Sequence, residues 1–292
     1  MNILVSVNSK YFEPLRVLLS SLARTQSERC NVYFLNFSLS PLKIRELESF
    51  CSFLRLPLAV VEIPENIKES INKKAQELPP HLSCETYVRL FAPFLLSEVD
   101  RVLWLDADCL VRGDLKDFYD QDLGNKVISA CDHCNWILPG IPGYSYWEYP
   151  RRKRKGEYFN AGVILFDLEK CRAMEAFKPD VMRGKIALSN IKNSPCQDQS
   201  ILNDLLSPGL VAWGDPLLYN LFTNQNWEGG FVSGSWQYDL YEKAKILHFC
   251  CANKPWNLLD PYDPIVRGYW LKGYEEVLKI DQEVLKQSFK KD

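Results

Sequence analysis

The chain has 292 residues, of which 47% are hydrophobic and 13% aromatic, so it can bury a large core and a disordered protein is excluded. Its 35 basic and 37 acidic residues leave a net charge of -2, which gives no electrostatic basis for binding nucleic acid. This length fits one large α/β domain or two small ones.

The amino terminus lacks the features of a secretory signal. Residues 1–7 have no basic stretch and too short an apolar run, and no segment approaches the roughly eighteen apolar residues of a membrane span. We therefore expect a cytoplasmic protein, with at most peripheral contact at the inner face of a membrane. The ten cysteines are scattered through apolar segments, and we expect them to be free thiols. The oligomeric state is left open.

The first hundred residues alternate between apolar strands and helices with an apolar face. This alternation predicts a parallel, doubly wound sheet. Ser40 and Pro41 suit the N-cap and first turn of a helix, and Ser83 is a plausible N-cap of another. Strands are predicted at residues 2–7, 31–37 and 58–63, and helices at 14–23, from 41 to 50 and from 83 onward.

An apolar run at residues 102–105 leads directly into Asp106 and Asp108, which flank Ala107. Such a run predicts a buried strand, and ligands of parallel sheets bind at the carboxyl ends of the strands. Two carboxylates there are costly to bury unless a cation lies between them. A divalent metal that also binds a diphosphate is the simplest such cation. The alternative interpretation is an acidic turn that closes the strand.

The second half continues as strands, one helix and a long loop. We expect a single domain over residues 1–260, with residues 261–292 as a helical extension at the carboxyl terminus. The loop at 135–157 is long enough to suggest a function, and small residues at 160–162 would let a ligand approach a strand closely. Strands are predicted at 127–131 (followed by Asp132), 158–166 and 245–249, and a helix at 197–206.

Four further residues suggest a ligand site, each with a plainer alternative. His248 could complete a metal site with the two carboxylates, or be an ordinary structural histidine. Lys254 could neutralise a phosphate, or be a solvated lysine in a turn. Asp198 could act in the site, or only cap the helix that begins beside it. Arg89 lies in an otherwise apolar helix, so its guanidinium must find an acid or leave the core.

The type of ligand also bears on the type of metal. Mixed carboxylate and imidazole ligation favours Mn²⁺, with Mg²⁺ as a possible substitute, and disfavours Zn²⁺. A rival zinc site would use Cys131, His133 and Cys134 with Cys250 or Cys251, but it lacks a second cysteine pair at ligand spacing. The basic run at 151–155 is interpreted as a solvated loop or a contact for an anionic acceptor.

Taken together, these segments resemble the retaining glycosyltransferases of family 8, which include bacterial lipopolysaccharide galactosyl- and glucosyltransferases and the glycogenins. The resemblance extends from residue 2 to about residue 256. It rests on five blocks in the family's order: Thr86–Leu90, Leu103–Asp108, Phe159–Val163, Gln197–Gln199, and His248–Cys250 leading to Lys254–Trp256.

The resemblance implies a GT-A fold, a single Rossmann-like domain whose mostly parallel sheet is flanked by helices. It implies a UDP-sugar donor, Mn²⁺ bound by Asp106, Asp108 and His248, and an acceptor contact at Asp132. Asp198 and Gln199 would lie at the reacting centre, with a β-phosphate oxygen of the donor as the base. The donor would contact Val7, Asn8, Arg89, Ala107, Asn160, Ala161, Asp198, Gln199, Cys251 and Lys254.

Three positions depart from the family's galactosyltransferase pattern. Asn8 replaces an aspartate near the uracil, although its amide oxygen could still accept a hydrogen bond from the base. Lys10 replaces an asparagine near the ribose. Cys251 replaces a glycine whose backbone approaches the diphosphate.

The sequence therefore predicts a hexosyltransferase that uses UDP-glucose or UDP-galactose and a saccharide or glycolipid acceptor, as in lipopolysaccharide biosynthesis. One alternative is a non-catalytic module that binds a sugar nucleotide or glycan on the same fold. The other is an interaction protein stabilised by zinc. Neither the donor sugar nor the acceptor can be chosen from the sequence.

Overall fold

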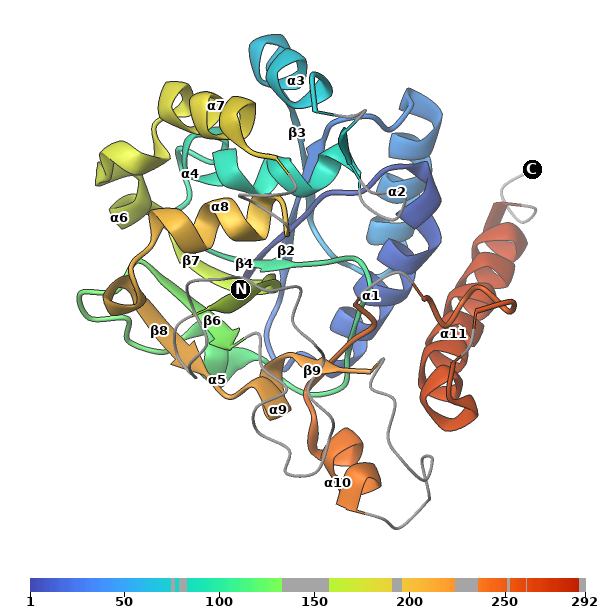
Figure 1. Cartoon of the computed structure of the whole chain (residues 1–292). Coiled ribbons are helices and arrows are strands. Elements are labelled where there is room, and N and C mark those ends of the chain that lie inside the picture. The colour runs from blue at the N-terminus through green and yellow to red at the C-terminus, as the bar shows by residue number, and fades with distance from the viewer. Residues whose placement is uncertain are drawn as a thin grey trace.

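A computed structural model describes residues 1–74, 77–78, 83–132, 158–190, 196–223, 236–250, 253–260 and 262–288 (Figure 1). Its centre is a seven-stranded sheet in the order β3-β2-β1-β4-β7-β6-β8. The strands are β1 (Asn2–Val5), β2 (Asn31–Asn36), β3 (Leu58–Glu62), β4 (Arg101–Leu105), β6 (Ile128–Asp132), β7 (Phe159–Asp167) and β8 (Val211–Gly214).

Strands β1 to β4 are mutually parallel, as the alternating pattern predicts, and β8 is parallel to β6. Strand β7 is inserted antiparallel between β4 and β6. Its amino end therefore lies at the carboxyl end of β4, where Val163 pairs with Leu105 and the Asp106 amide donates to the Gly162 carbonyl at 2.8 Å. Residues from both strands thus meet at one edge of the sheet.

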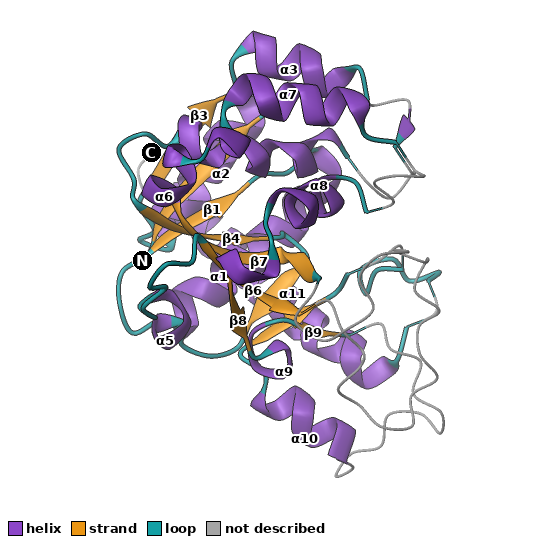
Figure 2. Cartoon of the chain, turned by 60° about the vertical axis from the view of Figure 1, so that its left-hand side comes forward, coloured by secondary structure: helices purple, strands orange, loops and turns teal. Residues whose placement is uncertain are grey.

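Helices cover both faces of this sheet (Figures 1 and 2). Successive residues of β1 and β4 enter opposite cores: Leu103 packs with α1, α2 and α11, whereas Trp104 packs with α3, α7 and α8. A strand buried on both faces has a continuous run of apolar residues, which is why β4 could be recognised from the sequence.

The α-helices are α1 (Phe12–Thr25), α2 (Pro41–Phe53), α3 (Glu65–Asn72), α4 (Ala92–Leu95), α5 (Lys116–Tyr119), α6 (Leu168–Ala173), α7 (Pro179–Leu188), α8 (Asp198–Leu205), α9 (Pro216–Tyr219), α10 (Trp236–Lys243) and α11 (Pro264–Ser288).

One of the two predicted helix caps is confirmed. The Ser40 hydroxyl accepts a hydrogen bond from the Lys43 amide at 3.4 Å, at the start of α2. Ser83 does precede a helix, but the prediction of a side-chain cap is wrong: its carbonyl, not its hydroxyl, accepts from Thr86. The segment is a 3₁₀-helix, η3 (Cys84–Phe91), as are the short turns η1 (Ser9–Tyr11), η4 (Glu175–Phe177) and η5 (Pro208–Leu210).

A small second sheet brings the carboxyl-terminal third to the same edge. It consists of β5 (Cys109–Val111), β10 (Ile246–His248) and β9 (Leu221–Phe222), with β10 in the middle. His248 pairs directly with Cys109, and the Phe249 amide donates to the Asp108 carbonyl at 2.9 Å. This pairing places residues 140 positions apart in sequence side by side.

Helix α11 packs along α1 (Figure 1). Its buried residues Val266, Trp270 and Val277 join the core on that face of the sheet. Gly273 allows the close approach, because a Cβ atom there would lie 2.9 Å from Val17 Cγ1 and 3.1 Å from Leu110 Cδ1. Within the described residues, no helix has both the length and the apolar character needed to cross a membrane.

Two glycines of α11 provide a matched test of this packing. Glycine-to-alanine changes inside a helix normally stabilise by about 0.5–1 kcal/mol. We expect that gain for Gly268→Ala, since no atom lies within 4 Å of the added Cβ. Gly273→Ala should instead destabilise, by about 1–3 kcal/mol from overpacking. Urea unfolding of both variants measures the difference, and equal stabilities would show that α11 is not closely packed on α1.

Candidate active site

The site is built at the edge where β4 ends, β7 begins and β10 passes beside β5. Asp106, directly after β4, is half-buried, and its Oδ1 accepts a hydrogen bond from Trp104 and forms an ion pair with Arg89. Trp104 Nε1 lies 2.8 Å away and Arg89 Nη2 lies 2.9 Å away. Its other oxygen, Oδ2, is directed toward His248, with 4.0 Å between Oδ2 and Nε2.

Asp108 is buried between two groups that can carry positive charge. Its Oδ2 accepts from Lys254 Nζ at 2.6 Å, and its Oδ1 lies 3.3 Å from His248 Nε2. Burial alone would raise the pKa of Asp108, but Lys254 and His248 hold it well below its ordinary value. Lys254 is itself buried, and although burial lowers its pKa, the neighbouring Asp108 carboxylate raises it further, so the ammonium stays charged.

The carboxylate oxygens of Asp106 and Asp108 and the Nε2 atom of His248 are suitable ligands for a hard divalent cation. Neighbouring ligand atoms of an octahedral ion bound at about 2.1 Å are about 3 Å apart. His248 Nε2 lies at a similar distance, 3.3 Å, from Asp108 Oδ1 and at a longer distance, 4.0 Å, from Asp106 Oδ2. The side chain of Cys109 lies within 4.8 Å of Asp108 and His248. Burial and the two aspartates raise the pKa of this thiol well above its ordinary value. It therefore remains a neutral thiol, a poor ligand for such an ion.

Gly162 is a packing glycine, which is one of the two roles that the small residues at 160–162 could have. A Cβ at residue 162 would lie 2.2 Å from His248 Cε1 and 2.9 Å from Asn160 Oδ1. The missing side chain thus makes room for the imidazole ring. The small residue is required because β7 and β10 approach each other at this point.

Arg89 is buried and forms ion pairs with both Asp106 and Asp198. Its guanidinium stacks on Trp104 at 4.4 Å and contacts Asp106, Asp198 and the carbonyls of Thr86 and Ala161. The guanidinium has found its acids inside the core, which is one of the two outcomes expected for a charge in an apolar helix. Among the described residues, at least one N–H on each terminal nitrogen has no hydrogen-bond acceptor.

Asp198 begins α8 and is 5% exposed. Its Oδ2 lies 3.0 Å from Arg89 Nε, but that N–H is donated to Thr86, so among the described residues Oδ2 has no hydrogen-bond donor. Burial raises the pKa of Asp198 to about 6, against the opposing effect of Arg89 and with a smaller contribution from Asp106. The side chain does not cap the helix. The N-cap residue Gln197, with φ of 52°, turns the chain so that Asp198 faces the site.

Asn160 and Gln199 form a hydrogen-bonded pair beside Asp198. Gln199 Oε1 accepts from Asn160 Nδ2 and from the Ala161 amide, each at 3.0 Å. Asn220, which the sequence analysis missed, donates to Asn160 Oδ1 at 2.9 Å and lies 2.8 Å from His248 Nδ1. No periodicity marks Asn220, because it lies in irregular backbone between α9 and β9.

The residues expected to hold the nucleotide follow β1. Val7 is buried, and Ala107 is buried between the two aspartates. Asn8 Oδ1 accepts from the Lys10 and Tyr11 amides and caps η1. The expectation that this oxygen would accept from a base is therefore wrong, because both of its lone pairs are used. Its amide N–H groups are the atoms left to donate to a ligand.

Asp132 ends β6 and pairs with Phe159, so it lies at the same edge as the rest of the site. Cys251, His133, Cys134 and the whole predicted loop at 135–157, with its basic run at 151–155, lie outside the described residues. Six of the eight described cysteines are buried, and Cys30, Cys51, Cys84, Cys109, Cys131 and Cys171 are free thiols, as expected.

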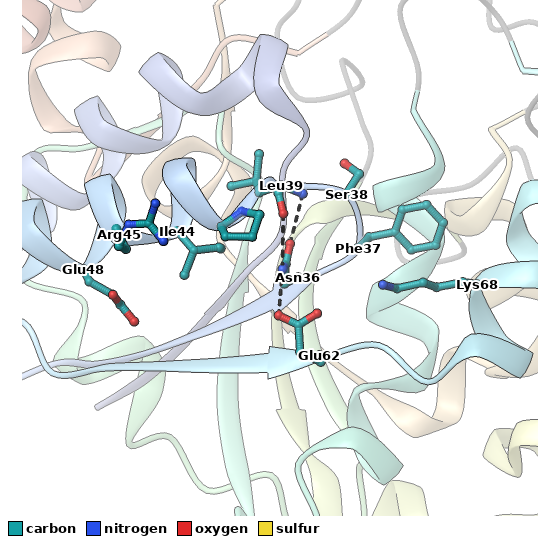
Figure 3. Close-up of a pocket in the computed structure, with 10 residues that line it drawn as sticks. Asn36, Phe37, Ser38, Leu39, Ile44, Arg45, Glu48, Glu62 and Lys68 are labelled. Atoms are coloured by element: carbon teal, nitrogen blue, oxygen red, sulfur yellow. Dashed lines mark hydrogen bonds between the residues drawn. The ribbon is translucent and has the colours of Figure 1, made fainter.

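A separate hollow of about 590 Å³ lies at the carboxyl ends of β2 and β3 (Figure 3). Asn36 forms its floor, where its amide bonds to Glu62 and to the backbone of Leu39. None of the predicted site residues lines this hollow.

Comparison with known proteins matches this chain to a family of glycosyl transferases. The sequence model of glycosyl transferase family 8 matches residues 2–259. Glycosyltransferase GlyE of Streptococcus pneumoniae is 28% identical over 61% of this chain and 38% of its own length. Glycosyltransferase GlyF of the same organism is 24% identical over 88% of this chain and 57% of its own. The chain thus spans about half the length of these two relatives.

The fold is also that of a solved glycosyltransferase. The structure of galactosyltransferase LgtC in complex with donor and acceptor sugar analogues superposes with a TM-score of 0.69. The superposition covers 94% of this chain and 96% of LgtC at 21% identity. This agreement confirms the predicted single α/β domain with the GT-A fold.

The raised pKa of Asp198 makes the stability of the metal-free protein depend on pH. Because the folded-state pKa rises from 3.8 to about 6, ionisation opposes folding, and stability falls as pH rises through this interval. Asp198→Asn removes that penalty, so at pH 7.5 the variant should be more stable by up to about 3 kcal/mol. The gain should vanish toward pH 4.

Urea unfolding between pH 4.5 and 7.5 measures this effect. Asp204→Asn, on the exposed side of the same helix, is the control and should show no such pH-dependent gain. An Asp198→Asn variant that matches wild-type stability at pH 7.5 would contradict the raised pKa.

Proposed function

The chain belongs to glycosyl transferase family 8, and we propose that it transfers a hexose, glucose or galactose, from a UDP-sugar to a saccharide or glycolipid acceptor with retention at the anomeric carbon. The observation that carries the proposal is the convergence of Asp106, Asp108, His248 Nε2 and the Lys254 ammonium at one buried edge. Donors for a diphosphate and ligands for a divalent cation are thereby combined in one place.

Asp106, Asp108 and His248 would hold Mn²⁺, with Mg²⁺ as a substitute. The ion would supply Lewis-acid stabilisation of the departing UDP. Lys254 assists from the protein side: its ammonium, held by Asp108 and the Phe249 carbonyl, would neutralise a phosphate oxygen of the donor. Asn8 donates to the uracil through its amide nitrogen.

On the sugar side, Asp198 Oδ2 is a buried acceptor that lacks a hydrogen-bond donor among the described residues. A sugar hydroxyl would satisfy it, and the bond would favour the ionised carboxylate. Arg89 forms ion pairs with Asp198, which would contact the sugar, and with Asp106, which would bind the metal. One buried guanidinium thus holds both carboxylates in place.

Gln199 does not serve as a nucleophile. Its Oε1 already accepts two N–H groups, and its lone pairs are therefore directed at Asn160 and β7. Without a protein nucleophile, retention requires that the acceptor hydroxyl attack from the face that UDP leaves. Gln199 then holds Asn160 and excludes water beside the anomeric carbon, and Asp132 contacts the acceptor.

The remaining expectations form part of the same proposal: residues 1–260 are the catalytic domain, 261–292 are its helical extension, and the protein acts in the cytoplasm. A non-catalytic module would bind a UDP-sugar without turnover. A zinc-stabilised interaction protein would bind zinc without any dependence on UDP.

The test is release of UDP from UDP-glucose and from UDP-galactose, with and without Mn²⁺ and without acceptor. We expect slow, Mn²⁺-dependent hydrolysis of one donor. Asp106→Asn should lower that rate about 100-fold or more through loss of a metal ligand. Asp100→Asn, an exposed carboxylate just before the opposite end of β4, is the matched control and should keep it. Hydrolysis that is independent of Mn²⁺, or unaffected by Asp106→Asn, would refute the metal assignment.

A further inference from the structure

A chain of hydrogen bonds runs from His248 to the backbone of β7. His248 Nδ1 contacts Asn220 Oδ1 at 2.8 Å, and Asn220 Nδ2 contacts Asn160 Oδ1 at 2.9 Å. The same Asn160 oxygen accepts the Gly162 amide at 2.9 Å. Asn220, Asn160 and His248 are all buried, with at most 7% of each exposed.

The direction of these bonds is set by the backbone. A backbone amide can only donate, so the atom of Asn160 that faces the Gly162 N–H must be its oxygen. The Ala161 amide likewise can only donate, so the Gln199 atom that faces it must be the oxygen Oε1. Because Oε1 accepts, the Asn160 atom beside it must be the donor Nδ2. The orientation of the Asn160 amide is thus determined twice.

The same logic extends to the imidazole ring. Since Asn160 presents oxygen, Asn220 must present its NH₂ group to Asn160 and its oxygen to His248. An amide oxygen accepts only, so Nδ1 of His248 carries a proton. In the neutral ring, the lone pair is then on Nε2, which points at Asp108 and Asp106.

We propose that Asn220 is a positioning residue that holds His248 as its Nδ1–H tautomer, with Nε2 directed at the metal site before any metal arrives. Nothing else described around the ring can do this, because the opposite nitrogen faces only carboxylates. The proposal rests on the proposed function insofar as the ligand of Nε2 is the catalytic metal.

The role differs from simple packing. Partners that orient a metal-bound histidine commonly change metal affinity 10- to 100-fold when removed. Asn220 also donates to Asn160, so its acceptor and donor halves can be separated by substitution. Asn220→Ala removes both halves, whereas Asn220→Asp keeps an acceptor for Nδ1–H and loses the donor.

The first measurement is the tautomer itself, in the metal-free protein. The chain has three histidines, so ¹⁵N NMR of histidine-labelled protein can be assigned by single substitutions, at a pH where the spectrum shows a neutral ring. We expect the proton of His248 on Nδ1 in the wild type and in Asn220→Asp. In Asn220→Ala the ring should no longer hold that single tautomer. A wild-type His248 that is protonated on Nε2 would overturn the proposal whether or not the protein transfers sugar.

The second measurement is Mn²⁺ affinity without donor, from the electron paramagnetic resonance signal of free Mn²⁺. We expect Asn220→Ala to weaken binding about 10- to 100-fold and Asn220→Asp to remain within about threefold of the wild type. Asn36→Ala is the matched control, because Asn36 is equally buried and hydrogen-bonded but lies at the separate hollow (Figure 3). It should lower the melting temperature and leave Mn²⁺ affinity unchanged.

The contrary outcomes are distinct. If Asn220→Ala folds and binds Mn²⁺ as the wild type does, Asn220 is only structural. If Asn220→Ala fails to fold, the isosteric Asn220→Asp decides, since a large loss of Mn²⁺ affinity there would also overturn the proposal. Absence of Mn²⁺ binding in the wild type would instead refute the proposed function and leave the tautomer result standing.

Discussion

The structure depends on the compensation of three buried or half-buried carboxylates by two buried cations. Asp106 and Asp198 share Arg89, and Asp108 is bound by Lys254. Burying an uncompensated charge is so costly that each acid must keep its partner. The positions of η3, α8 and the segment after β10 are therefore linked through charge as well as through packing. The three carboxylates outnumber the two cations by one negative charge, and this excess favours the binding of a divalent cation.

Much of the fold could be predicted because strands buried on both faces and helices with one apolar face leave clear patterns. Residues 102–105 were recognised in this way. The antiparallel insertion of β7 could not be, since an apolar run has no direction. That insertion explains why Asn160 at the start of one strand meets Asp106 at the end of another.

The charged members of the site were found because charges in apolar segments stand out. Asn220 was missed because an asparagine in irregular backbone is unremarkable until its partners are known. The role of the Asn8 oxygen was misjudged for a related reason: the sequence shows which atoms a side chain has, but not which of them local backbone amides already occupy. For Gly162 the sequence left a ligand contact and simple packing open, because only the fold shows that its neighbour is the ring of His248.

The pairing of Asp132 with Phe159 has a consequence for how such a chain can diversify. The segment between them leaves the sheet and returns to it at adjacent positions, so its ends are fixed by the ladder of β6 and β7. Changing the length of a connection with fixed ends costs little free energy, because the closure entropy grows only with the logarithm of its length. Insertions or deletions there would leave the register of the sheet and the metal ligands in place. The length of this segment could then change in evolution without moving Asp106, Asp108 or His248.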